Sequence, residues 1–313
     1  MTMDGNVSER RRFASRVACP ICQGRSVKLG DKPGRFIRQD FSLRECEECT
    51  YAFIEDPCID FEQIYNEDYY RAKGADPLTD YMFEMEHPDE SIRVHELRGI
   101  VEVVRSITGS LAGKSWLDFG CGNGGLVRHL STEAPDARLV AGFEEGWIAD
   151  EARRKQINIL SKSELERLDG SFDVVSAIEV IEHVFDPVET LSRIRKLLKP
   201  GGLFFYTTGN SAPFRKNLLA WPYVLPEIHV GFFNPRCASV ALEKAGFDVQ
   251  PGRYLPGFEK IIHFKVLKNL GLTRDSAVFN LIPWTLVSRL IDMKYLMSDL
   301  PMGRARQGLT KNA

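Results

Sequence analysis

The chain has 313 residues and carries 41 lysines and arginines against 43 aspartates and glutamates, a formal net charge of −2. This balance gives no overall bias towards nucleic acid, and the length allows one large domain and a small one. No run of about 18 apolar residues occurs, so we expect no transmembrane helix. No apolar N-terminal run precedes Cys19, so we expect no signal peptide and a cytoplasmic protein.

Four of the seven cysteines form two Cys-x-x-Cys pairs, Cys19/Cys22 and Cys46/Cys49, separated by 23 residues. Four thiolates presented by two tight turns satisfy a tetrahedral zinc ion with no open position, which is typical of a structural site. The metal would supply folding energy that a module of about 35 residues cannot obtain from its own core. Short alternating segments, 35–37 and 41–43, lie between the pairs. Redox-active or free cysteines are the less favoured alternative.

Aromatic residues follow the second cysteine pair. They are Phe53, Tyr65, Tyr69 and Tyr70. The pattern Cys-x-x-Cys-x-x-Phe, followed by Tyr-x-x-x-Tyr-Tyr, resembles the lead-in of a large family of bacterial methyltransferases. The resemblance implies an acceptor such as a sugar, a nucleotide-sugar or a secondary metabolite. Thr50 stands where that family usually has a glycine, so we expect a slightly different backbone there. The tyrosines either form a flap over the cofactor or substrate, with Tyr69 as a candidate catalytic residue, or dock the zinc module on the main domain.

The chain is expected to divide into four parts. They are a zinc-ribbon module (1–56), a tyrosine-containing linker and lead-in helix (57–110), a cofactor domain (111–255) and a helical C-terminal segment with a last strand (256–313). Within the second part, the polar segment 73–90 predicts a linker or mobile loop. Apolar residues at helical spacing predict a helix over 91–107.

Strands and helices alternate through the third part. Apolar runs at 116–119, 139–143, 172–178 and 203–207 predict buried parallel strands. Helices are expected near 124–134, 148–155 and 188–198. The alternation predicts an α/β fold with a doubly wound, Rossmann-like sheet.

A glycine-rich turn follows the first of these strands. Gly120, Gly122 and Gly124 would let the backbone approach a ligand closely, and Asp118 can accept hydrogen bonds from that ligand. Glu144, about 20 residues further on, stands where an acid can hold both ribose hydroxyls, with Glu145 as the competing candidate. The letters also fit the dinucleotide fingerprint, which alone is a weak match. A nucleotide-like cofactor at the carboxyl edge of the sheet is therefore expected.

Together with Lys199-Pro200-Gly201-Gly202, these elements resemble the class I S-adenosylmethionine-dependent methyltransferases over about residues 91–254. The resemblance implies S-adenosylmethionine as the cofactor, bound by the turn from Asp118 to Gly124 and by Glu144, with Glu179 as a further contact. A nicotinamide oxidoreductase and a non-enzymatic scaffold fit the sequence less well.

The strand 172–178 leads into Glu179-Val180-Ile181-Glu182-His183. Positions i, i+3 and i+4 share one face of a helical turn, so this segment would gather two carboxylates and an imidazole at the catalytic edge. His229 lies further on, and in the family that the chain resembles a histidine near this place lies beside the substrate. His229 or His183 would be a general base for an acceptor hydroxyl.

Two other interpretations of these residues stay open. In one, Glu179, Glu182, His183 and His229 bind a divalent metal that acidifies the hydroxyl, as a resemblance to some quinone-biosynthesis and small-RNA terminal methyltransferases implies. In the other, Glu182 and His183 only brace the loop. The segment 211–226, with Trp221 and Tyr223, is either an aromatic wall for the acceptor or a packed surface loop.

Apolar residues with helical periodicity fill 256–300. They predict a helical insertion before a last antiparallel strand near 304–310, although a lid, a dimer face or a membrane-surface helix are alternatives. The expected function is methyl transfer to a hydroxyl of a small molecule such as a sugar or glycan precursor. The alternative is an RNA methyltransferase whose zinc ribbon grips RNA; the acidic residues of the ribbon leave no clean basic stripe, and no DNA is expected. The oligomeric state is not predicted.

Overall fold

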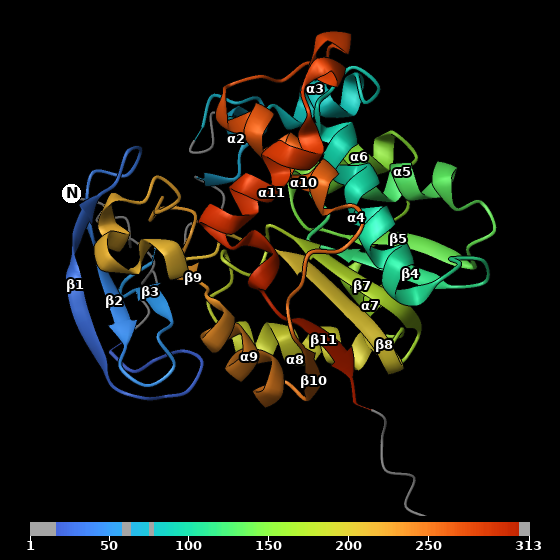
Figure 1. Ribbon diagram of the computed structural model, residues 1–313. Helices are drawn as coiled ribbons and strands as arrows, with labels where there is room; N and C mark the ends of the chain where they lie inside the picture. The colour runs from blue at the N-terminus through green and yellow to red at the C-terminus, as the bar shows by residue number, and fades with distance from the viewer. Residues whose placement is uncertain (1–16, 58–63, 75–77, 307–313) are drawn as a thin grey trace, which may run out of the picture.

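The computed structural model describes residues 17–57, 64–74 and 78–306 (Figure 1). A seven-stranded sheet in the order β10-β11-β8-β7-β4-β5-β6 forms the centre of the main domain. Its strands are β4 (Ser115–Phe119), β5 (Leu139–Phe143), β6 (Ile159–Leu160), β7 (Phe172–Ile178), β8 (Leu198–Thr207), β10 (Phe247–Gln250) and β11 (Met302–Ala305). The strands from β6 to β8 pair in parallel, whereas β11 runs antiparallel to both β8 and β10. The predicted doubly wound α/β fold is confirmed.

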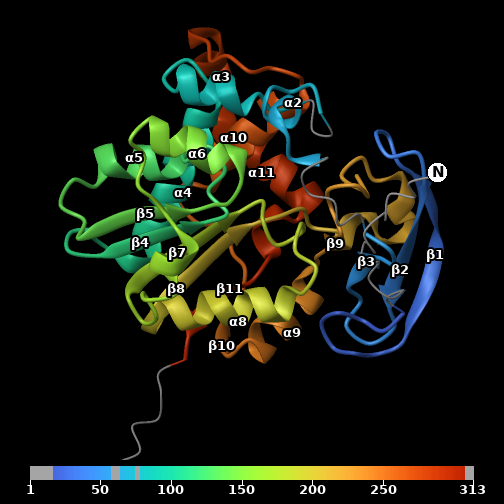
Figure 2. The same ribbon diagram turned by 180° about the vertical axis from the view of Figure 1, so that it is seen from behind.

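Helices cover both faces of this sheet (Figures 1 and 2). One face carries α4 (Arg93–Thr108), α5 (Gly125–Glu133) and α6 (Trp147–Arg154), and the other carries α8 (Pro187–Leu197) and α9 (Pro235–Lys244). The short α7 (Lys162–Leu165) lies between β6 and β7 in the chain. In α8, Asp186 accepts a hydrogen bond from the Glu189 N–H and caps the helix, while Leu191, Ile194 and Leu197 are buried. This spacing gives α8 one apolar face for the sheet.

The N-terminal module is a small antiparallel sheet of β1 (Ser26–Pro33), β2 (Asp40–Cys46) and β3 (Ala52–Ile54). Its fourth strand, β9 (Gly231–Phe232), comes from the main domain and pairs with β3. All three residues of β3 are buried, so its backbone groups need partners on both sides. The segment 35–37 is not a strand but part of the connection between β1 and β2, whereas 41–43 lies in β2. The predicted boundary at residue 56 therefore separates segments that share one sheet.

The segment 73–90 is not simply a linker, because it contains the helix α3 (Tyr81–Glu86) after the short α2 (Glu67–Tyr70). The Asp80 side chain accepts a hydrogen bond from the Phe83 N–H at 2.8 Å, which caps α3, and Met82 and Met85 are buried. An N-cap and two buried methionines thus hold a helix where proline and polar residues predicted a loop.

The C-terminal segment folds back over the main domain. It contains α10 (Phe258–Asn269), the 3₁₀ turns η2 (Ala277–Leu281) and η3 (Met297–Asp299), and α11 (Trp284–Tyr295). A Cβ atom on Gly99 of α4 would lie 2.7 Å from the Gly257 carbonyl oxygen, so a glycine is needed where α10 begins against α4. The last strand is antiparallel as predicted but spans Met302–Ala305, and residues 307–310 of the prediction lie outside the described residues. None of the helices in the described part of the chain combines the length and apolarity needed to span a bilayer.

Candidate active site

The glycine turn connects β4 to α5. Gly120, Gly122 and Gly124 all have left-handed backbones, with φ of +73°, +53° and +73°. A Cβ atom would lie 2.6 Å from Val180 at Gly120 and 2.8 Å from Ile157 at Gly124, but at Gly122 it would meet no atom within 4 Å. The first and third glycines are therefore required by packing as well as by conformation, and Gly122 faces open space.

Asp118 and Glu144 stand at the carboxyl ends of β4 and β5. The Ser176 hydroxyl donates to Asp118 Oδ1 at 2.7 Å, and the Gly122 N–H donates to Glu144 Oε2 at 3.0 Å. Burial raises the pKa of Asp118 to about 7 against the opposing effect of the Ser176 hydrogen bond. Burial also raises the pKa of Glu144 above its ordinary value. A cationic or hydroxylated ligand beside these two carboxyl groups would stabilise their ionised forms.

A cavity of about 1340 Å³ begins at this edge and runs to the histidines and to the C-terminal helices. It exceeds the roughly 300–1,000 Å³ of common ligand sites, so it has room for a second molecule beside a cofactor. The residues that the sequence suggested as site residues in the main domain and the tyrosine segment line it, apart from Glu182 and Gly124. They are Tyr69, Asp118, Gly120, Gly122, Glu144, Glu179, His183 and His229.

The segment 179–183 is not a helical turn as expected. Glu179 has a left-handed backbone with φ of +54°, and the chain turns sharply after β7. The two carboxylates still meet, because the Tyr223 hydroxyl lies 2.5 Å from Glu182 Oε1 and 3.2 Å from Glu179 Oε2. The Gly209 N–H donates to the same hydroxyl at 3.0 Å. Tyr223, from the loop 211–226, therefore brings together what local helical spacing does not.

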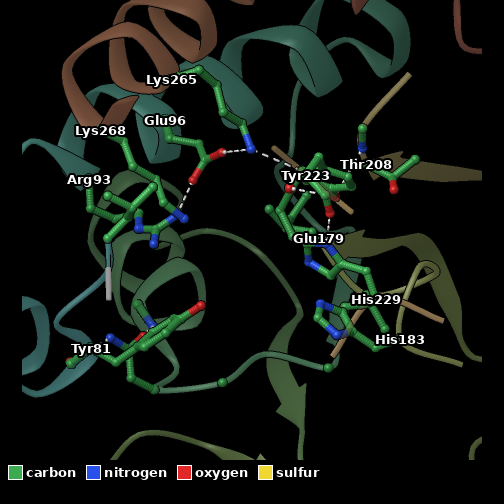
Figure 3. Close-up of a pocket in the computed structure, with 18 of the residues that line it drawn as sticks. Tyr81, Arg93, Glu96, Glu179, His183, Thr208, Tyr223, His229, Lys265 and Lys268 are labelled. Carbon is green, nitrogen blue, oxygen red and sulfur yellow. Dashed lines mark hydrogen bonds and ion pairs between the residues drawn. The ribbon is translucent and has the colours of Figure 1, made fainter. Parts of the chain in front are cut away.

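His183 and His229 lie side by side with ring centroids 4.8 Å apart (Figure 3). Nδ1 of His183 donates to the Ile228 carbonyl at 2.8 Å, and Nδ1 of His229 donates to the Tyr223 carbonyl at 2.6 Å. In a neutral ring with the proton on Nδ1, the lone pair is on Nε2. Glu182, His183 and His229 each offer a ligand atom, and these atoms lie within 4.8 Å of one another. Glu179 is not part of this group.

A buried ion network that the sequence did not reveal borders the histidines. Lys265 Nζ of α10 lies 2.9 Å from Glu179 Oε1 and 3.5 Å from Glu96 Oε1 of α4 (Figure 3). Arg93 pairs with Glu96 and, at 3.0 Å, with Glu84. Glu84, Arg93 and Glu96 lie near one another in the chain, but Glu179 and Lys265 are far from them and from each other, so no local pattern could have identified the whole network.

The pKa values of Glu179 and Glu182 are shifted in opposite directions. Burial by itself would raise the pKa of Glu179, but the Lys265 ammonium outweighs it and holds that pKa below its ordinary value. Burial raises the pKa of Glu182, and the negative charge of Glu179 raises it further. Glu179 is therefore ionised and paired with Lys265 of α10, whereas Glu182 is stabilised by a proton or by a bound cation.

A series of stacked rings lines the same cavity. Centroid distances are 4.2 Å from His229 to Tyr223, 4.8 Å from Tyr223 to Trp221, 4.6 Å from Trp221 to Phe214 and 5.8 Å from Phe214 to Tyr295 of α11. Trp221 and Tyr223 thus contribute to the wall of the cavity. The sequence did not identify Phe214 or Tyr295, which join the series only through tertiary contact.

The lead-in tyrosines lie over the cavity. Tyr69 and Tyr65 meet edge to face at 4.9 Å, and both line it. The Tyr65 hydroxyl, rather than that of Tyr69, lies 2.9 Å from Nδ1 of His183. Tyr69 instead packs with Tyr70 and Tyr81. This arrangement favours the flap interpretation and points to Tyr65 as the tyrosine next to the histidines.

The four cysteines of the module cluster as their spacing predicts. The distance between the Sγ atoms of Cys19 and Cys49 is 3.5 Å, and that between the Sγ atoms of Cys22 and Cys46 is 3.4 Å. All four Sγ atoms lie within 4.8 Å of one another. These distances exceed a disulfide bond of about 2.05 Å and suit four thiolates around one metal ion. Thr50 has the same left-handed φ, +64°, as Gln23 in the first turn. Thr50 thus adopts a conformation that glycine takes most easily, and the expected difference from the backbone of the family stays a prediction.

Comparison with known proteins agrees with this architecture. The sequence pattern of a methyltransferase domain family matches residues 95–251. A ubiquinone biosynthesis O-methyltransferase of Methylococcus capsulatus is 32% identical over 184 residues, which cover 54% of this chain and 75% of that protein. One of Burkholderia vietnamiensis is 37% identical over 182 residues, covering 54% of this chain and 76% of that protein. For one of Nitrosococcus oceani, 39% identical over 117 residues, the match covers 33% of this chain and 47% of that protein.

Solved structures with the same type of fold are more distant. The complex of the Haloferax volcanii Trm112 methyltransferase activator with a methyltransferase contains a chain with 19% identity and a TM-score of 0.48, covering 78% of this chain and 100% of that one. Phosphoethanolamine N-methyltransferase 2 of Haemonchus contortus has 16% identity and a TM-score of 0.48, covering 90% of this chain and 71% of that one. Because the family pattern spans half of the chain, and relatives match over three quarters of their own length, this protein belongs to the methyltransferase domain family and is an S-adenosylmethionine-dependent methyltransferase.

Proposed function

We propose that the enzyme transfers the methyl group of S-adenosylmethionine to a hydroxyl of a small-molecule acceptor. The observation that carries this proposal is the shared cavity, in which the glycine turn and Glu144 face His183 and His229. Relatives named as O-methyltransferases of ubiquinone biosynthesis support a hydroxyl as the accepting group.

In this proposal the cofactor occupies the end of the cavity at the glycine turn and supplies an activated methyl group on sulfur. Glu144 accepts hydrogen bonds from the ribose hydroxyls, and Asp118 faces the cationic amino-acid portion. Gly122 leaves the space that the cofactor needs. Glu179 also lines the cavity, but Lys265 and Tyr223 hold it at the boundary with the acceptor side. Positioning of the two reactants supplies most of the acceleration.

His229 is the proposed general base. The carbonyl of Tyr223 fixes the Nδ1 proton, so Nε2 is the nitrogen that accepts the proton of the acceptor hydroxyl as the oxygen takes the methyl group. His183 is held in the same tautomer by the Ile228 carbonyl. Nδ1 contacts orient both rings before the acceptor arrives, and this fixed orientation is what a base needs.

A divalent cation at Glu182, His183 and His229 is a variant of the same mechanism. The three residues fit a cation because their ligand atoms lie within 4.8 Å and because, among the described residues, none donates a hydrogen bond of ordinary length to the buried Glu182 Oε2. Such an ion would bind the acceptor oxygen and lower the pKa of the hydroxyl.

The stacked rings bear on the identity of the acceptor. Trp221 stacks on both Tyr223 and Phe214, Phe214 also stacks on Tyr295, and Tyr223 is tilted by 32° against His229, so much of the face area of Trp221 and Phe214 is already engaged. A sugar packs best on an open ring face, whereas a planar aromatic acceptor can place its own face against ring edges. We therefore favour a hydroxyl on a planar ring over the sugar or glycan precursor that the lead-in resemblance implied.

The cysteine cluster is proposed to hold one structural zinc ion. RNA recognition by this module is the alternative function. The ion pairs of the module disfavour RNA binding. Basic side chains are matched by acids in Arg44–Glu55 and Lys28–Asp31, and Glu45 is matched by Arg215. A phosphate-binding face would leave such basic groups to the nucleic acid.

The experiment that tests the function measures S-adenosylhomocysteine release with a panel of a catechol, a simple hexose and a short RNA. Turnover with the catechol supports the proposal, and turnover only with the RNA overturns it. Chelation that abolishes the rate, with recovery on added Mg²⁺ and with Glu182→Gln reproducing the loss, supports the cation. Turnover that survives chelation eliminates the cation and leaves His229 as the lone base.

A further inference from the structure

The N-terminal module with its four cysteines, called the cysteine module below, is joined to the acceptor side of the cavity by one segment of the chain. This segment forms hydrogen bonds with both. β9 begins two residues after His229 and completes the sheet of the module. We propose that the module is the positioning element of the acceptor side, so that the metal at the cysteines controls the order of the segment that carries Tyr223 and His229 and leaves the cofactor side unaffected. This inference rests on the zinc ion proposed above and goes beyond the structural role of such an ion within its own module.

The backbone before β9 is held from both sides. On one side, the Ile54 N–H of β3 donates to the Val230 carbonyl at 3.0 Å. On the other, the N–H groups of Val230 and Gly231 donate to the Glu182 carbonyl at 2.8 and 3.0 Å. Residues 230–231 therefore lie between the module and the turn that bears Glu182 and His183, and are hydrogen-bonded to both. If β3 unfolds, residues 230–231 lose their hydrogen bonds to the module, and both segments that carry the histidines become less well held.

A buried carboxylate reinforces this clamp. Glu227, only 3% exposed, stands two residues before His229. Its Oε1 accepts hydrogen bonds from the N–H groups of Phe36 at 2.8 Å and Ile37 at 3.4 Å, in the connection between β1 and β2. The module thus fixes the chain immediately before His229.

Both ends of the same segment are anchored on the module. Lys32 Nζ of β1 donates to the carbonyl oxygens of Leu219 at 2.9 Å and Trp221 at 3.4 Å. At the other end, the side-chain amide of Asn234 donates to the Thr50 carbonyl at 2.9 Å. Thr50 directly follows Cys49, so the N-cap of α9 is bonded to a turn that carries two of the metal ligands.

The contacts of the cofactor side are of a different origin. Asp118 bonds to Ser176 and Glu144 to Gly122, all within the main sheet and its loops. A module of this size depends on its metal for folding, whereas the large sheet does not. Loss of the metal is therefore expected to loosen 218–234 and 179–183 selectively. Phe41 and Leu43 of the module share an apolar core with Leu218, Val224 and Phe232, which extends the effect to the aromatic loop.

Hydrogen-exchange mass spectrometry on the full chain, before and after a strong chelator removes zinc, tests the inference. We expect exchange in 218–234 to rise about tenfold or more, exchange in 116–146 to stay unchanged, and the Kd for S-adenosylmethionine to stay within about twofold. Unchanged exchange in 218–234 overturns the inference, and so does an equal rise in both regions.

A matched pair of variants tests the docking with the metal in place. Glu227→Ala removes the oxygen that Phe36 and Ile37 bond, and is expected to raise exchange in 218–234 with the zinc content retained. Glu227→Gln keeps an oxygen acceptor and should restore protection. Glu47→Ala, on the exposed side of the module beside Arg25, is the control. Protein purified without zinc refutes the zinc proposal alone; exchange that does not distinguish Glu227→Ala from Glu227→Gln overturns the positioning role.

Discussion

The two sides of the cavity are assembled from the chain in opposite ways. The proposed cofactor side takes Asp118, the glycine turn and Glu144 from residues 118–144, at the ends of two adjacent strands. The acceptor side draws on the turn after β7, the loop that ends at β9, the helices α4, α10 and α11, and the cysteine module. On the first side, backbone conformation makes the site. On the second, buried charges and ring stacks make it, and Lys265 and Tyr295 reach it from far away in the sequence.

This difference has a consequence for variants. A substitution on the cofactor side should change the affinity for the ligand that binds there and little else, because the contacts that hold these residues are local. A change on the acceptor side should spread, since Tyr223, Glu179 and Lys265 share partners and neighbours that share partners do not act additively.

The largest effect is expected at the base. His229→Ala should reduce turnover by about 10²–10⁴, the usual contribution of a general base, while the affinity for S-adenosylmethionine stays within about twofold. S-adenosylhomocysteine release and calorimetric titration measure the two quantities. His87→Ala, at an exposed position away from the cavity, is the control. Near-normal turnover in His229→Ala would move the base to His183 or Tyr65.

Removal of the buried Lys265 ammonium is expected to lower the free energy of unfolding rather than the affinity for the cofactor. Lys265→Met leaves Glu179 and Glu96 without their shared cation, and breaking a buried pair costs about 3–5 kcal/mol. Urea denaturation measures the free energy of unfolding. Lys260→Met, which removes the half-exposed pair with Glu102, should cost less than about 1 kcal/mol. Equal losses in the two variants would contradict the network.

A smaller and more local effect is expected on the cofactor side. Asp118→Asn removes a charged contact worth about 1.5–3 kcal/mol, so the affinity for S-adenosylmethionine should fall by about 10- to 150-fold with stability retained. Asp136→Asn, on an exposed turn, serves as the control. Unchanged affinity in calorimetric titration would exclude Asp118 from the cofactor site.

The same carboxyl group predicts a pH dependence of binding. Burial raises the pKa of Asp118 to about 7 in the cofactor-free protein, and a cationic ligand favours the ionised form. The affinity should therefore be constant above pH 7 and fall by up to about tenfold for each pH unit below it. Calorimetry in buffers of different ionisation enthalpy would detect the released proton. A slope that persists in Asp118→Asn would assign it to another group, such as Glu144.

The smallest effect concerns the first cysteine turn. Gln23 is exposed and has a left-handed backbone with φ of +64°, which costs a residue with a side chain about 1–2 kcal/mol. Glycine avoids this cost but loses entropy of about 0.5–1 kcal/mol. Gln23→Gly should therefore stabilise the protein by up to about 1 kcal/mol in thermal unfolding, whereas Gln23→Ala should not. A loss of stability in Gln23→Gly would show that the Gln23 side chain has a role in the turn.

The sequence was sufficient where the relevant interactions are short in range. Cys19, Cys22, Cys46 and Cys49 come together because each pair is held by one turn. Asp118 and Glu144 could be expected to lie close together because residues at the ends of adjacent parallel strands must share an edge. The series of strands and helices in the main domain follows from apolar runs and their periods, which depend on neighbouring residues alone.

Other features of the site were decided only by the tertiary structure. The spacing of Glu179, Glu182 and His183 predicted a helical turn, but Glu179 adopts φ of +54° and its carboxylate is paired with Lys265, 86 positions later in the chain. The sequence also predicted a domain boundary at residue 56, but it did not predict that β9 of the main domain completes the sheet of the module. Helical or strand periodicity reports which face of an element is buried, but not which distant element covers it. The proposed cofactor side could therefore be predicted from the sequence, whereas the proposed acceptor side required the fold that brings α10, α11 and the cysteine module around His229.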